Sequence, residues 1–121
     1  MKTIKHFVDG QKFSGSSKRV GKVFNPATGE QKSEVILANK EDLKKTVETA
    51  KNAFENWSNT TPIQRARVFF KFKELIEKNA EELTKIIVSE HGKVYEDAKG
   101  SLIRGLEVVE FACGIPQMLK A

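Results

Sequence analysis

The sequence predicts an α/β protein, with two short β-hairpins over residues 1–38 and four helices over residues 39–121. In the first third of the chain, turn motifs separate short apolar segments. After residue 38, apolar residues recur at spacings of three and four, which is the period of an α-helix. A chain of 121 residues is long enough for one domain with one hydrophobic core.

The two hairpins are predicted from their turns. Asp9 and Gly10 suit a two-residue hairpin turn, because both central positions of that turn take a positive φ. In the segment from Asn25 to Glu30, Pro26 fixes φ and Gly29 can supply a left-handed residue. The strands expected on either side of these turns cover residues 4–8, 11–13, 22–24 and 32–37.

Capping residues predict where the first three helices begin. Asn39 is a favoured N-cap residue, and acidic residues follow it where the positive end of the helix dipole lies. Thr61, Pro62 and Gln64 form a capping-box sequence with proline at the first helical position. Asn79 is expected to cap the third helix, and Gly92 to end it.

The apolar faces of these three helices differ in width. The second helix is apolar over more than half its circumference, so we expect it to need covering on more than one side. An isolated chain of this length has few elements to provide that cover. The first helix presents a single stripe of Leu43, Val47, Ala50, Phe54 and Trp57. The third is expected to bury Leu83, Ile86 and Ile87.

The fourth helix is predicted from Val94 to about Pro116. Gly100 and Gly105 lie inside it, where each costs about 1 kcal/mol relative to alanine. Two such costs predict that another segment or a ligand approaches the backbone there. Arg104 lies beside this opening, and Phe111 falls on the same face. The apolar stripe consists of Ala98, Leu102, Leu106, Val109 and Cys113.

The composition excludes several classes of function. Lys and Arg number 21 against 16 Asp and Glu, a net charge of +5. The two signs are interleaved, which is typical of solvated helix surfaces and argues against a nucleic-acid site. A single cysteine, no metal-ligand spacing and no long apolar run predict a cytoplasmic protein without disulfide, metal or membrane span.

Five motifs occur in an order that carries a family resemblance. Together they resemble the N-terminal segment of the aldehyde dehydrogenase superfamily over essentially the whole chain. The motifs are Val8-Asp9-Gly10, Asn25-Pro26-Ala27-Thr28-Gly29-Glu30, Ala53-Phe54-Glu55-Asn56-Trp57, Thr61-Pro62-Ile63-Gln64-Arg65 and Glu90-His91-Gly92-Lys93.

The segment from Arg104 to Ala112 is similar to the methylmalonate-semialdehyde dehydrogenase branch. That resemblance implies oxidation of malonate or methylmalonate semialdehyde with NAD and coenzyme A. It also implies that Arg104 holds the substrate carboxylate, for which a guanidinium offers a matching planar fork. Phe111 would line the substrate tunnel. The alternatives are an exposed Arg104 paired with Glu107 or Glu110, and a Phe111 packed in the core.

The resemblance also implies what this chain lacks. The nucleophilic cysteine, the glutamate base and most of the NAD site of the family lie beyond Ala121, and the sequence contains no Gly-x-Gly-x-x-Gly motif. We therefore expect no catalytic, cofactor-binding or metal-binding residue here. Cys113 has no histidine at helical spacing and is interpreted as a small buried hydrophobe.

The expected partner is the remainder of a longer, homo-oligomeric enzyme, and the 121-residue chain alone is predicted to be inactive. One alternative is another aldehyde dehydrogenase, such as one acting on succinate semialdehyde. A second alternative is a non-catalytic helical binding module. Its docking surface would be the apolar face of the second helix.

Overall fold

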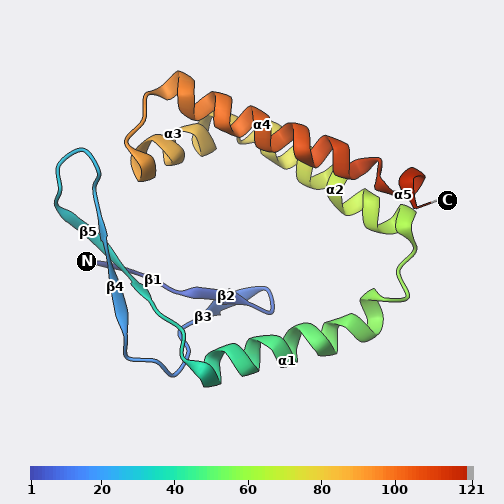
Figure 1. Cartoon of the computed structure of the whole chain (residues 1–121), viewed down its shortest axis with the longest axis horizontal. Helices are drawn as coiled ribbons and strands as arrows, with labels where there is room; N and C mark the ends of the chain where they lie inside the picture. The colour runs from blue at the N-terminus through green and yellow to red at the C-terminus, as the bar shows by residue number, and fades with distance from the viewer. Residues whose placement is uncertain (120–121) are drawn as a thin grey trace. The chain divides into compact units, whose positions relative to one another are not determined.

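The computed structural model describes residues 1–119 and contains two compact units, Met1–Asn59 (unit 1) and Thr60–Ala121 (unit 2). Figure 1 shows the order of the elements, with the strands and one helix in unit 1 and the remaining helices in unit 2. In the part of the chain that the structure describes, none of the helices has the length and apolar character that crossing a membrane requires.

Both predicted hairpins form in unit 1. Asp9 and Gly10 have φ values of 54° and 72°, as the two-residue turn requires. Gly29 has a φ of 74° in the second turn, where its amide donates to the carbonyl of Asn25. The hairpin strands are β2 (His6–Val8), β3 (Gln11–Phe13), β4 (Val20–Phe24) and β5 (Gln31–Ile36).

One strand of unit 1 was not predicted as a separate element. The expected strand over residues 4–8 is interrupted at Lys5, and β1 (Lys2–Ile4) pairs in parallel with β5 instead. The resulting three-stranded sheet has the order β1-β5-β4. The hydroxyl of Thr3 donates to a carboxylate oxygen of Glu34 across this pairing at 2.8 Å.

Helix α1 (Lys40–Trp57) begins at the predicted cap. Asn39 accepts the amide of Asp42, whose carboxylate in turn accepts the amide of Asn39 at 3.1 Å, so a full capping box forms. The same carboxylate accepts the amide of Ser16 at 2.7 Å and is buried. Asp42 therefore fastens the loop before β4 to the start of α1.

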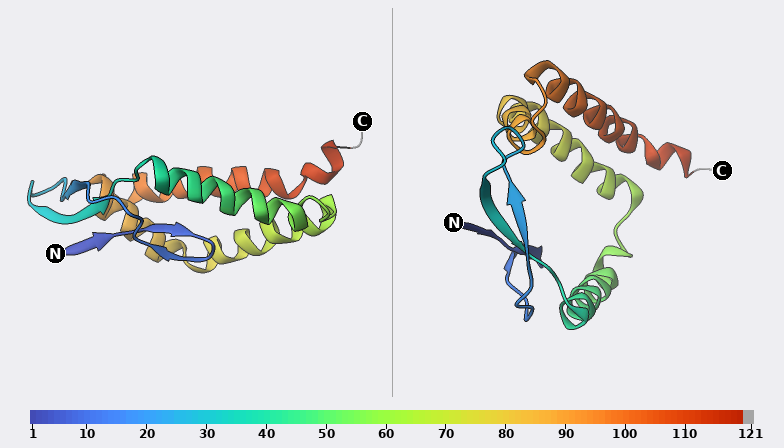
Figure 2. Two further views of the ribbon diagram at one scale, coloured as in Figure 1. Left: turned by 90° about the horizontal axis from the view of Figure 1, so that it is seen from below. Right: turned by 60° about the vertical axis from the view of Figure 1, so that its left-hand side comes forward.

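Unit 2 consists of α2 (Pro62–Lys78), α3 (Ala80–His91), α4 (Tyr95–Cys113) and the short α5 (Ile115–Met118). The capping box of Thr61 and Gln64 opens α2 as predicted. Gly92 ends α3 with a φ of 81°. Helices α2 and α4 lie side by side and run in opposite directions in both views (Figures 1 and 2), and α3 packs on α4.

The buried residues of unit 2 are small. Ala98 has no exposed surface, Thr84 is 1% exposed, and Ala66 and Cys113 are also buried. Small side chains let helix backbones approach closely, which positions α2, α3 and α4 against one another. The predicted stripe of α4 is confirmed by Ala98 and Cys113, and the interpretation of Cys113 as a buried hydrophobe is confirmed.

Three local predictions for unit 2 are wrong. Ile86 is 48% exposed, and Thr84 takes the buried position in α3 because its hydroxyl is satisfied by the carbonyl of Ala80. Asn79 precedes α3 but forms no side-chain cap, since its amide group donates to the carbonyl of Leu75. Helix α4 ends at Cys113, before Pro116, which lies in the first turn of α5.

Large apolar side chains remain exposed on α2, as the width of its apolar face predicts. Val68, Phe70, Phe72 and Leu75 are between 44% and 58% exposed. The stripe of α1 is also exposed, with Phe54 at 64%. Contiguous apolar surface on a helix is normally covered by another chain segment or a partner.

Candidate functional site

Arg104 lies near the middle of α4 with its side chain exposed. Its Nη2 donates to Oγ of Ser101 at 3.3 Å. Its Nη1 lies toward Gly100, since a Cβ added to that glycine would be 3.7 Å from this nitrogen. The guanidinium is therefore held at one edge against its own helix.

The predicted alternative for Arg104, an ion pair on the same helix, is not found. Glu110 instead pairs with Lys73 of α2 at 3.3 Å, and Lys73 also pairs with Glu77. The pKa of Lys73 is raised, mainly by the hydrogen bond that its ammonium donates to Glu77. Within residues 1–119, no carboxylate lies within 4.0 Å of the Arg104 guanidinium, so its charge is uncompensated there.

A second cation lies at the same hydroxyl. Nζ of Lys93, in the connection between α3 and α4, donates to Oγ of Ser101 at 3.0 Å. The Ser101 hydroxyl donates to the carbonyl of Asp97 at 3.1 Å. Sequence reasoning did not single out Lys93 or Ser101 as candidate site residues. The spacing of three between Ser101 and Arg104 was the available signal, because residues three apart are neighbours on a helix.

Phe111 is 67% exposed and lies two helical turns after Arg104. Residues seven apart share a helix face, so Phe111 and Arg104 lie along one side of α4. Val108, between them on this side, is 68% exposed. The alternative of a Phe111 packed in the core is wrong for this chain, and the face carries one cation followed by two apolar side chains.

The predicted close approach at the two glycines of α4 does not occur among the described residues. Apart from the adjoining backbone of α4 and the neighbouring residues, a Cβ added to Gly105 would meet no atom within 4 Å, and at Gly100 it would meet only the Arg104 side chain. The space beside Gly105 is therefore open.

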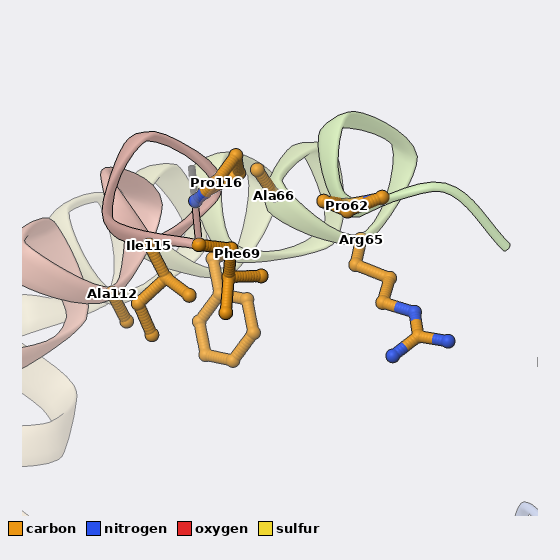
Figure 3. Close-up of a pocket in the computed structure, with 8 residues that line it drawn as sticks. Pro62, Arg65, Ala66, Phe69, Ala112, Ile115 and Pro116 are labelled. Carbon is orange, nitrogen blue, oxygen red and sulfur yellow. The ribbon is translucent and has the colours of Figure 1, made fainter. Parts of the chain in front are cut away.

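A separate apolar pocket of about 170 Å³ lies in unit 2, and neither Arg104 nor Phe111 lines it. In Figure 3 the Arg65 side chain extends away from the apolar side chains of Phe69 and Ile115. Nε of Arg65 donates to the carbonyl of Thr60 at 2.9 Å. The lining residues are Pro62, Arg65, Ala66, Phe69, Ala112, Ile115, Pro116 and Leu119.

Comparison with known proteins connects this architecture to a family. The model of the aldehyde dehydrogenase family matches residues 13–121. The chain is 44% identical over 120 residues to a malonate-semialdehyde dehydrogenase of Pseudomonas aeruginosa, covering 99% of this chain and 24% of the relative. The chain belongs to the aldehyde dehydrogenase family.

Two solved structures share both sequence and fold with the chain. The methylmalonate-semialdehyde dehydrogenase of Oceanimonas doudoroffii is 47% identical with a TM-score of 0.94, covering 99% of this chain and 24% of that one. A protein of Sinorhizobium meliloti 1021, assigned provisionally as a methylmalonate-semialdehyde dehydrogenase and solved with NAD, is 49% identical with the same TM-score and coverage. The chain thus spans about a quarter of the length of the relatives it matches.

Proposed function

We propose that this chain is the N-terminal part of an NAD-dependent, coenzyme A-acylating dehydrogenase of malonate or methylmalonate semialdehyde. The observation that carries the proposal is the exposed guanidinium of Arg104, which has no carboxylate partner within residues 1–119. Family membership and the names of the most similar relatives support it.

The chemistry of the substrate explains why an arginine suits this position. A malonate-type semialdehyde carries a carboxylate at the end opposite the reacting aldehyde. A guanidinium binds a carboxylate through two parallel hydrogen bonds, which fix its orientation as well as its position. Holding that end positions the aldehyde carbon for attack by a nucleophile supplied elsewhere. The open space beside Gly105 would admit the substrate, and Phe111 would form an apolar wall.

The cofactors and the reacting groups are assigned to the remainder of the enzyme. The glycines of this chain are not spaced as a dinucleotide-binding motif requires, so we place most of the NAD site in the remainder of the enzyme. The other three quarters of the enzyme's chain would then hold NAD and coenzyme A and supply the nucleophile and the base. The complete enzyme would be a cytoplasmic homo-oligomer. On this proposal the 121-residue chain alone is inactive.

The test is substrate preference in the complete enzyme. Arg104→Leu is expected to lower kcat/KM for malonate semialdehyde about 10- to 100-fold, because a hydrogen bond to a charged group is lost. The kcat/KM for propanal, which has no carboxylate, should stay within about twofold of wild type, as should both values for the control Lys99→Leu on the same helix. An unchanged ratio of the two substrates in Arg104→Leu would contradict the proposal.

Two alternatives have their own outcomes. A higher kcat/KM for succinate semialdehyde than for malonate semialdehyde would favour another aldehyde dehydrogenase. The exposed apolar face of α2, with Phe70 at 58% and Val68 at 54%, favours a helical binding module. A chain that is monomeric or cleanly oligomeric and melts cooperatively would support that module, whereas aggregation or strong binding of a dye for apolar surface would indicate a severed enzyme segment.

A further inference from the structure

Lys93, Ser101 and Arg104 form a small cationic cluster at α4. The family resemblance assigned a role to Arg104 but none to Lys93 or Ser101. Lys93 and Arg104 both donate to Oγ of Ser101, at 3.0 Å and 3.3 Å. Both nitrogens therefore lie within hydrogen-bond distance of one oxygen. Two positive charges this close repel each other unless an anion joins them.

The hydrogen bonds of Ser101 are fully used. A serine hydroxyl has one donor and two acceptor positions. The donor goes to the carbonyl of Asp97 at 3.1 Å, which leaves both acceptor positions for Lys93 and Arg104. The hydroxyl thus holds the two cations in a fixed relation to each other and to the backbone of α4.

The cluster lacks a negative partner in the part of the chain that the structure describes. Within residues 1–119, neither Lys93 nor Arg104 has a carboxylate within 4.0 Å, although Glu96, Asp97 and Glu107 lie on the same helix. Most N–H groups of both cations remain without an acceptor there. Lys93 is partly buried, so its charge is less exposed to water than that of a fully solvated surface lysine.

We propose that Lys93 is the second cation of the carboxylate site of Arg104, with Ser101 as the positioning residue that holds both. This inference rests on the proposed function and names two further specificity residues for the same substrate. The carboxylate accepts two hydrogen bonds from the Arg104 guanidinium, and one of its oxygens also accepts from the Lys93 ammonium. A small aldehyde that carries a carboxylate is therefore bound by two charges rather than by one fork alone.

The experiment compares malonate semialdehyde with propanal in the complete enzyme. Lys93→Met is expected to raise KM for malonate semialdehyde at least about tenfold, with kcat and the kinetics of propanal within about twofold of wild type. Lys93→Arg should restore most of the loss, because it keeps the charge. Ser101→Ala should raise the same KM about threefold, and Ser101→Thr should restore it. Lys99→Met, a neighbouring lysine outside the cluster, is the matched control.

Each outcome decides between the two proposals when Arg104→Leu is measured beside these variants. Loss of preference in both Arg104→Leu and Lys93→Met supports the inference. Loss in Arg104→Leu alone overturns the role of Lys93 and leaves the proposed function intact. An equal fall with both aldehydes in Lys93→Met would assign the lysine to the fold and also overturn it. A wild-type enzyme without preference for the carboxylated aldehyde contradicts the proposed function itself.

Discussion

Replacing Gly15 with alanine is expected to destabilise unit 1 more than any ordinary turn substitution. Gly15 has a φ of 70°, and an added Cβ would lie 2.6 Å from Oδ1 and 2.7 Å from Cγ of Asp42. The left-handed backbone costs an alanine about 1–2 kcal/mol. Overpacking adds about 1–3 kcal/mol, because the Asp42 carboxylate is already fixed by the amides of Ser16 and Asn39.

Gly29→Ala provides a matched control for this prediction. Gly29 has nearly the same φ, 74°, but an added Cβ there would meet no atom within 4 Å. Gly29→Ala should therefore cost only the backbone part, about 1–2 kcal/mol. The difference between the two variants isolates the clash with Asp42.

Urea unfolding followed by tryptophan fluorescence measures both variants, because Trp57 is the only tryptophan and lies in unit 1. The double variant of Gly15→Ala with Asp42→Ala should lose less stability than the sum of its single variants, since the carboxylate that blocks the Cβ is gone. Equal costs for Gly15→Ala and Gly29→Ala, or strict additivity in the double variant, would refute the reasoning.

Two further predictions concern pH and the open face of α4. The backbone amide of Ser16 is the main cause that lowers the pKa of Asp42, so the folded state binds its proton less readily than the unfolded state. The stability that Asp42 contributes is present above the ordinary aspartate pKa of about 4 and is lost as the pH falls toward the lowered pKa. Asp42→Asn should remove this loss when the free energy of unfolding in urea is measured against pH. Parallel pH dependences of wild type and variant would contradict the prediction. Gly105→Ala should stabilise α4 in the isolated chain by up to about 1 kcal/mol, because alanine has the higher helix propensity and the added Cβ would meet no atom within 4 Å outside the adjoining helix backbone. In the complete enzyme it should lower kcat/KM for malonate semialdehyde, and an unchanged value would show that the space serves no substrate.

The elements that could be predicted from sequence are those fixed by local chemistry. Asp9-Gly10 and the capping boxes at Asn39 and Thr61 act within a few residues, so the sequence around them is sufficient. The parallel pairing of β1 with β5 joins segments about thirty residues apart and leaves no local pattern. Thr84 was missed for a related reason, since a polar residue is buried only where its hydroxyl finds a carbonyl.

The residues of the candidate site also divide into those that local sequence indicates and those that only the folded structure brings together. Helical spacing placed Arg104 and Phe111 on one face of α4, where both are exposed, and the family resemblance supplied the carboxylate role of Arg104. The bond from Lys93 to Ser101 spans eight residues across the end of a helix, which no periodic pattern predicts. The apolar face of α2 was predicted from the width of its apolar surface and is exposed, but the sequence carries no signal that identifies what covers it.

The most direct test of the account is formation of NADH from malonate semialdehyde, measured with and without coenzyme A. The complete enzyme should produce NADH and the corresponding acyl-CoA, and the purified 121-residue chain should produce neither. Dehydrogenase activity in the isolated chain would contradict the assignment of the catalytic groups to the remainder. A complete enzyme that ignores malonate and methylmalonate semialdehyde while oxidising other aldehydes would contradict the proposed substrate.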